Sequence, residues 1–181
     1  MPPDAPTPSR RFREAERLRA MVGDCLDRVA ELPDSLDQRS PGPDRWSPLQ
    51  LVEHIVISER EVLDFPVPLP DRDNPSRKFR HRFNRMVVFL VLQLRIPVPV
   101  PEAAMAPTGR TPLHRLRRIA AEVHDWLEEV VRSESPEILE RPLFRHPVAG
   151  PMTLDQVLHL DRLHIAAHQR QLEDLIADLT E

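Results

Sequence analysis

The sequence predicts an all-α protein. Four stretches carry apolar residues at helical spacing, and two of these stretches begin at a capping box. The chain also has only 4 glycines and no tyrosine among its 181 residues, a composition that favours helix over sheet. With 40% apolar and 30% charged residues, it is expected to form one soluble globular domain, residues 1–181, that needs no disulfide to fold.

The first helix is predicted for residues 9–32, where apolar side chains recur every three or four positions until Pro33 ends the pattern. Its apolar stripe consists of Phe12, Ala15, Leu18, Val22, Cys25 and Val29. The second helix is predicted to start at the capping box Ser47-Pro48-Leu49-Gln50 and to end near residue 64, with Trp46 and Leu51 as the hydrophobic staple.

The third helix is predicted for residues 112–133, because Thr111-Pro112 supplies a cap and a proline at the first helical position. Its apolar stripe consists of Leu113, Leu116, Ala120, Val123, Leu127 and Val130. A second capping box, Thr153-Leu154-Asp155-Gln156, opens a fourth helix that is predicted to run to about residue 179.

Residues 65–110 form a proline-flanked insertion between the second and third helices. Prolines at positions 66, 68, 70 and 75, and again at 97, 99, 101 and 107, bracket a predicted extra helix over about residues 76–95. The first half of this helix is basic and the second half is apolar, so it could lie on a membrane surface or bind an anionic ligand. The alternative is a helix that crosses the other helices with its apolar end docked and its charges solvated.

Composition and charge exclude several classes of protein. A net charge of −4 argues against nucleic acid as a partner. Cys25 is the only cysteine, which excludes an intrachain disulfide and a cysteine-rich zinc cluster; we predict that it is a small core residue. No apolar stretch of the signal-peptide type follows the N-terminus, and the apolar run 86–94 is shorter than the roughly 20 residues of a spanning helix. We therefore expect a cytoplasmic protein without a transmembrane segment.

Three histidines, His54, His164 and His168, are candidate metal ligands. His164 and His168 share one face of the fourth helix, and His54 lies on the inward side of the second. Any one of them could be an ordinary core histidine, but burying unpartnered imidazoles costs on the order of 1–3 kcal/mol each, and a shared metal ion removes that cost. Imidazole binds zinc, nickel or iron, and three imidazoles leave one position open for water or substrate. The pattern is typical of a catalytic rather than a structural metal site.

The remaining histidines are expected at the surface or behind the ligands: His81, His114, His124, His146 and His159. Of these, His146 is expected in a loop before Pro147. Three polar residues are candidates to orient the ligand imidazoles: Glu61, Asp161 and Gln171. A solvated carboxylate is the simpler interpretation of Glu61 and Asp161.

Two segments resemble the signature regions of the DinB/YfiT-like family. The first is Arg45-Trp46-Ser47-Pro48-Leu49-Gln50-Leu51-Val52-Glu53-His54. The second extends from His146-Pro147 through Gly150-Pro151-Met152-Thr153-Leu154 to His164-Ile165-Ala166-Ala167-His168-Gln169-Arg170-Gln171. The resemblance spans all four helices, with the insertion as its least typical part. It implies a four-helix bundle of up-down-down-up arrangement, a nickel or zinc ion on the three matching histidines, and often a homodimer.

Family members with known activity use a low-molecular-weight thiol, as S-transferases or thiol-dependent isomerases, so the resemblance implies thiol-dependent chemistry, above all S-transfer, on a small-molecule substrate. A divalent ion with an open position lowers the pKa of a bound thiol, but it could also activate water and make the protein a hydrolase. A hydrolase should place a general base beside the metal, with Asp161 or Glu61 as candidates. A thiol transferase would need a pocket for the thiol carrier, with the cationic residues at 77–85 over its mouth. The third possibility is a non-catalytic bundle that binds a partner through the insertion.

Overall fold

The computed structural model describes residues 9–43, 45–63, 87, 105–142, 144–146 and 150–180. The predicted extra helix over residues 76–95, which includes the cationic residues at 77–85, lies outside the described residues except for residue 87.

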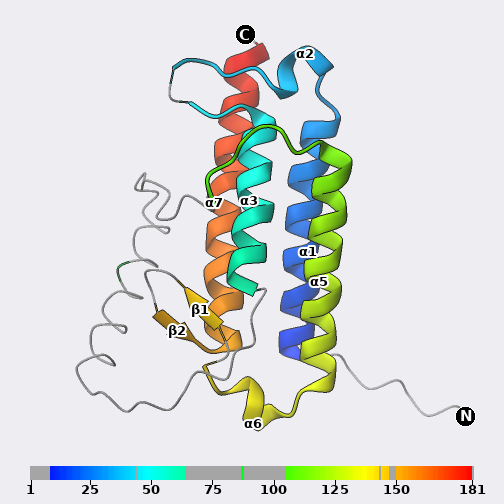
Figure 1. Ribbon diagram of the computed structural model, residues 1–181, viewed down its shortest axis with the longest axis vertical. Coiled ribbons are helices and arrows are strands. Elements are labelled where there is room, and N and C mark those ends of the chain that lie inside the picture. Colours follow the sequence, from blue (N-terminus) through cyan, green and yellow to red (C-terminus); the bar gives the residue numbers. More distant parts are fainter. Residues whose placement is uncertain are drawn as a thin grey trace, which may run out of the picture.

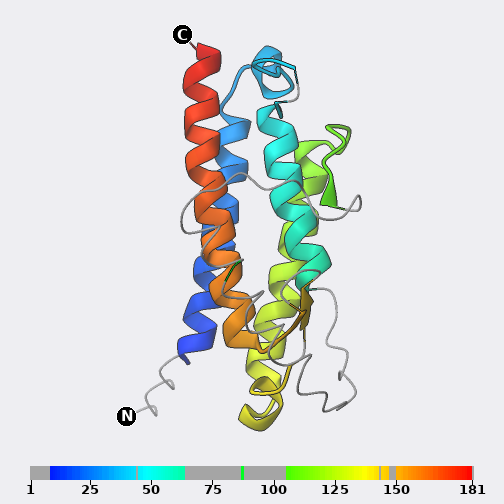
Figure 2. The same cartoon turned by 90° about the vertical axis from the view of Figure 1, so that its left-hand side faces the viewer.

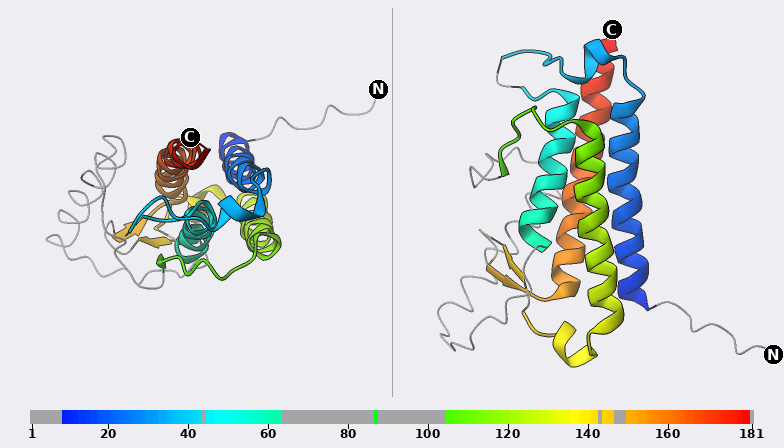
Figure 3. Two further views of the ribbon diagram at one scale, coloured as in Figure 1. Left: turned by 90° about the horizontal axis from the view of Figure 1, so that it is seen from above. Right: turned by 45° about the vertical axis from the view of Figure 1, so that its right-hand side comes forward.

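Four long helices form a bundle (Figure 1). They are α1 (Arg10–Ala30), α3 (Pro48–Leu63), α5 (Leu113–Ser133) and α7 (Leu154–Thr180). In Figure 1, α1 runs upward, α3 and α5 both run downward, and α7 returns upward. The view from above in Figure 3 shows a four-sided arrangement in which α1 and α3 each pack against both α5 and α7. The all-α prediction, the four helices and the up-down-down-up arrangement are therefore confirmed.

Local hydrogen bonds explain where these helices begin. At the start of α3, Ser47 Oγ accepts a hydrogen bond from the N–H of Gln50 at 3.2 Å. In return, Gln50 Oε1 accepts one from the N–H of Ser47 at 3.0 Å, which confirms the predicted capping box. At the start of α7, Gln156 Oε1 accepts from the N–H of Thr153 at 3.1 Å. These bonds satisfy backbone donors that a helix N-terminus otherwise leaves without a partner.

The predicted cap of α5 is wrong. Pro112 occupies the N-cap position, and no side chain caps this helix. The hydroxyl of Thr111 instead donates to the buried carboxylate of Glu53. A hydrogen bond to an ionised carboxylate is stronger than one to a neutral backbone group, so the carboxylate competes successfully for the hydroxyl.

Short elements connect the long helices at both ends of the bundle. They are α2 (Asp34–Asp37), α6 (Pro136–Leu139), β1 (Phe144–His146) and β2 (Gly150–Met152). β1 and β2 pair antiparallel, with Phe144 opposite Met152, and both side chains are fully buried. The loop assignment of His146 is wrong, because this residue ends β1 opposite Gly150. A strand of three residues is too short to show the alternating pattern by which strands are predicted.

Each long helix buries one face against the others. The most deeply buried side chains include Leu18, Leu51, Leu127 and Ile165, one from each helix, all at 0% exposure. Cys25 is also in this core at 2% exposure, as predicted. Within the part of the chain that the structure describes, no helix combines the length and apolar character needed to cross a membrane.

The capping box at α3 provides a test of how the bundle is stabilised. Ser47→Ala removes the acceptor for the N–H of Gln50, and we expect the free energy of unfolding to fall by about 1 kcal/mol. Urea denaturation followed by circular dichroism measures this loss. Ser35→Ala, at an exposed serine of α2, serves as the control and should change stability by less than about 0.5 kcal/mol. Equal stability of the two variants would contradict the role of the capping box.

Candidate metal centre

The packing of α3 against α7 brings His54, His164 and His168 together. One ring nitrogen of each histidine lies within 4.8 Å of the corresponding atom of the other two. The ring centroids are 4.5 to 5.4 Å apart, and the rings meet edge to face. The two helices lie side by side in Figures 1 and 2, and they run in opposite directions. The i, i+4 pair on α7 therefore faces the single histidine on α3.

The imidazole of His54 is fixed from one side by hydrogen bonds. Its Nδ1 lies 2.9 Å from the carbonyl oxygen of Met105 and 3.3 Å from Ser58 Oγ. Because a carbonyl only accepts, the Nδ1–H of His54 donates to it, and Nε2 keeps its lone pair. The ring of Trp46 covers His54 at a centroid distance of 4.8 Å. This environment holds His54 in the tautomer that a metal ligand requires.

His168 is oriented in the same way. Its Nδ1 lies 2.9 Å from Gln171 Oε1, so the second ring nitrogen of His168 is the one directed at its neighbours. That Nε2 lies 3.0 Å from Nε2 of His164. Two facing lone pairs repel, so nitrogens at this separation must share a proton or a metal ion. Two nitrogens bound tetrahedrally to one zinc ion lie roughly 3.3 Å apart, so the geometry of the pair fits a divalent ion.

Burial favours the neutral form of His54 and of His168. Burial lowers the pKa of His54, although the Met105 carbonyl opposes the shift. Burial and the charge of His54 lower the pKa of His168 to about 4, against the opposing hydrogen bond to Gln171. Metal ions bind the neutral imidazole, so both rings are ready to bind at neutral pH.

Glu53, which was not predicted as a site residue, fixes the backbone beside the centre. Its carboxylate is fully buried and accepts three hydrogen bonds: from Thr108 Oγ1 at 3.0 Å, from the N–H of Gly109 and from Thr111 Oγ1. Burial raises the pKa of Glu53, but these hydrogen bonds outweigh it and hold the pKa below its ordinary value. The carboxylate therefore stays ionised and holds residues 108–111 against α3.

The segment held by Glu53 is the one that supplies the Met105 carbonyl to His54. Gly109 adopts a φ of 70° in this segment, and a Cβ atom there would lie 3.1 Å from the Gln50 side chain. A signal for Glu53 does exist in the sequence, since it is the one carboxylate in the stretch 49–57, whose other residues are apolar apart from Gln50 and His54. Its partners, however, lie more than fifty residues away along the chain, and spacing alone does not reveal them.

The three residues proposed to orient the ligands have different surroundings. Gln171 contacts Nδ1 of His168. Asp161 is buried at 3% exposure, and the charge that acts on it is that of Glu59. Glu61 is exposed, and it lies seven residues after His54, about 10 Å along the helix axis. That separation places Glu61 away from the imidazole of His54.

His124 is not at the surface. It is 1% exposed in the interior of the bundle, whereas His114 and His159 are exposed. Of the two positions expected for His124, at the surface or behind the ligands, the surface is therefore excluded.

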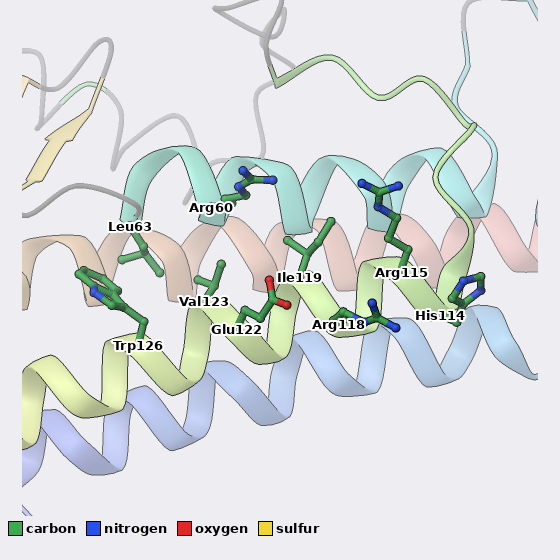
Figure 4. A pocket seen from close by; sticks show the side chains of 9 residues that line it. All are labelled: Arg60, Leu63, His114, Arg115, Arg118, Ile119, Glu122, Val123 and Trp126. Carbon is green, nitrogen blue, oxygen red and sulfur yellow. The ribbon is translucent and has the colours of Figure 1, made fainter.

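A separate groove lies between α3 and α5 (Figure 4). Its lining is largely cationic and apolar: Arg60, Leu63, His114, Arg115, Arg118, Ile119, Glu122, Val123 and Trp126. On an ideal helix, Arg60 and Leu63 point about 120° and 180° away from His54, so the groove and the three histidines lie on different sides of α3.

The fold and the histidine cluster together define a helical bundle with a candidate three-histidine metal centre. A family model described as the DinB superfamily matches residues 17–172, so the chain belongs to this superfamily. Among solved structures, the chain is similar to YfiT from Bacillus subtilis, with a TM-score of 0.57 and 16% sequence identity over 97% of this chain and 90% of that chain. YfiT is described as a probable metal-dependent hydrolase with an unusual four-helix bundle topology. A search of curated protein sequences found no match.

Substitution of Glu53 tests its role in holding the backbone. Glu53→Gln replaces an acceptor oxygen by an NH2 group that faces hydrogen-bond donors, and we expect a loss of stability of about 1–3 kcal/mol. Because the pKa of Glu53 is lowered on folding, its ionisation stabilises the native state above the unfolded pKa of about 4.3, and this contribution is lost as the pH falls below it.

Urea denaturation at pH 7 and at pH 3.5 measures both effects. The wild-type protein should lose more stability between the two pH values than Glu53→Gln does. Glu61→Gln, an exposed position on the same helix, is the matched control and should behave as wild type. If Glu53→Gln and Glu61→Gln are alike at both pH values, Glu53 does not hold the segment.

Proposed function

We propose that this protein is a metal-dependent enzyme whose divalent ion, nickel or zinc, is bound by His54, His164 and His168. The observation that carries this proposal is the convergence of three ring nitrogens within 4.8 Å of one another. The Nδ1–H groups of His54 and of His168 donate to carbonyl oxygens, which leaves their Nε2 atoms for the ion. Three protein ligands leave a coordination position for a substrate or for water, as in catalytic sites.

The groups around the centre shield His54 from water and orient two of the three imidazoles. Trp46 and the buried face of α3 shield His54 from water, which strengthens electrostatic interactions at the site. Gln171 and the Met105 carbonyl hold two of the imidazoles in one tautomer and one orientation. When bound, a divalent ion supplies Lewis acidity that lowers the pKa of a coordinated thiol or water.

We further propose that the reaction is transfer of a small electrophilic group to a low-molecular-weight thiol. A hydrolase needs a general base beside the ion, and the carboxylates on α3 and α7 that could serve are engaged elsewhere or distant. Glu53 is occupied by three donors, Asp161 is buried beside Glu59, and Glu61 is exposed about two turns away. A thiol would need no such base, because coordination to a divalent ion would lower its pKa enough for the proton to pass to bulk water at neutral pH.

Metal-dependent hydrolysis is the second candidate. It is favoured by the description of YfiT, whose fold this chain shares, as a probable metal-dependent hydrolase. In that case a metal-bound water would be the nucleophile, and solvent would have to take up its proton.

The metal ligands are tested by elemental analysis of the purified, untagged protein. We expect the double variant His164→Ala, His168→Ala to contain one equivalent of nickel or zinc less than wild type, because two of three ligands are lost. The matched control is His114→Ala, His159→Ala, which removes two exposed histidines. Equal metal content in all three proteins would show that the histidine cluster is not the site.

An assay of the metal-loaded protein distinguishes S-transfer to a thiol from hydrolysis. A panel of low-molecular-weight thiols is incubated with an aromatic halide or an epoxide, and loss of free thiol is compared with hydrolysis of ester and amide substrates in the absence of thiol. We expect thiol-dependent turnover that falls at least 100-fold in His164→Ala, His168→Ala. Hydrolysis without thiol, lost in the same variant, would reject S-transfer and favour the hydrolase.

A further inference from the structure

The groove between α3 and α5 combines cationic and apolar side chains along its length (Figure 4). Its volume is about 780 Å³, which lies in the range of pockets that bind small organic ligands. In Figure 4, Leu63 and Trp126 lie at one end of the groove, and His114 and Arg115 lie at the other. Arg115 precedes Trp126 by eleven residues, about 16 Å along the helix axis. The groove therefore suits an elongated ligand with one charged end and one apolar end.

Two arginines at the cationic end lack a counter-charge within the described part of the chain. Arg117, on the same helix, pairs with Asp27 at 2.6 Å, whereas Arg115 and Arg118 form no ion pair with any residue that the structure describes. Among the described lining residues, Glu122 is the one carboxylate, against three arginines. The groove thus carries an excess of positive charge in a chain whose net charge is −4. A cleft with charge of one sign and apolar walls attracts ligands of the opposite charge.

The start of α5 adds to this positive charge. Arg115 and Arg118 lie in the first two turns of the helix, at the end that carries a partial positive charge. No acidic residue lies in the first turn, and no side chain caps the helix. Cations at this end of a helix disfavour folding, so the stability of α5 gives no reason for the two arginines. A bound anion would be attracted both by their guanidinium groups and by the helix terminus.

The apolar part of the groove lies below the protein surface. Leu63 is fully buried, and Ile119, Val123 and Trp126 are half-buried. These side chains are recessed between two helices, so the flat surface of a lipid bilayer would not reach them. A single hydrocarbon chain is narrow enough to lie along them, and its burial there would favour binding.

We propose that the groove binds a free single-chain anionic amphiphile, namely a hydrocarbon chain that ends in a carboxylate, sulfate or phosphate group. Arg115 and Arg118 are three residues apart and share one face of α5, so both guanidinium groups can donate hydrogen bonds to the anionic group. The chain would lie along Ile119, Val123 and Trp126. Because the groove and the three histidines lie on different sides of α3, this inference does not rest on the proposed function.

Isothermal titration calorimetry of the full chain with decanoate, below its micellar concentration, tests the proposal. We expect one equivalent to bind, and we expect butanoate and decan-1-ol to bind at least tenfold more weakly, because the first lacks most of the chain and the second lacks the charge. Arg115→Gln, Arg118→Gln should weaken decanoate binding at least tenfold. The matched control Arg10→Gln, Arg17→Gln removes two exposed arginines from α1 and should leave the affinity unchanged.

Two further variants locate the bound anion. The chain has two tryptophans, so Trp46→Phe leaves Trp126 as the only one, and decanoate should change its fluorescence over the same concentration range as the calorimetric signal. His164→Ala, His168→Ala should bind decanoate as wild type does. Loss of binding in this histidine variant would instead place the carboxylate at the metal centre and overturn the proposal.

Three other outcomes would also overturn it. They are equal decanoate affinity of the two double arginine variants, equal affinity of the wild-type protein for decanoate and decan-1-ol, and binding to phosphatidylglycerol vesicles without binding of free decanoate. Circular dichroism checks that each variant is folded. If Arg115→Gln, Arg118→Gln does not fold, the comparison of decanoate with decan-1-ol and the Trp126 signal decide.

Discussion

The structure depends on one constraint, namely that polar side chains inside a helical bundle must find partners there. α3 carries four of them, Glu53, His54, Ser58 and Glu59, all at 6% exposure or less. Two of them, Glu53 and His54, restrict other parts of the chain. Glu53 fixes the segment that precedes α5, and His54 requires both a backbone carbonyl and the two histidines of α7. The positions of the other helices are thus set by polar groups as well as by apolar packing.

The connectivity makes this arrangement possible. Because α3 and α5 run in the same direction, the end of α3 at Leu63 and the start of α5 at Leu113 lie at opposite ends of the bundle (Figure 2). The chain re-enters the described part at Met105, whose carbonyl accepts from His54, and Glu53 then holds it up to Thr111. A simple up-down-up-down bundle with short loops would bring no such segment past His54. The segment that precedes α5 therefore supplies the carbonyl group that orients the imidazole of His54.

The sequence predicted the elements that obey periodic rules and missed those that depend on distant partners. The four helices and the capping box at Ser47 follow from patterns within twenty residues or so, and their ends agree closely with the structure. The hairpin was missed because its strands are three residues long. The three candidate ligands were found because histidine is rare on an apolar face. Glu53 was not, since its hydrogen-bond partners lie more than fifty residues away along the chain.

The apolar core means that the bundle does not need a metal ion at this centre in order to fold. Structural zinc stabilises small domains whose own core is insufficient, and such domains unfold without the ion. Here apolar residues of all four long helices form one continuous core, and the hairpin adds Phe144 and Met152 to it. The bundle can therefore remain folded with a few buried polar or charged side chains in its interior. An open coordination position is useful only on such a scaffold, because the ligands must keep their geometry while a substrate enters and leaves.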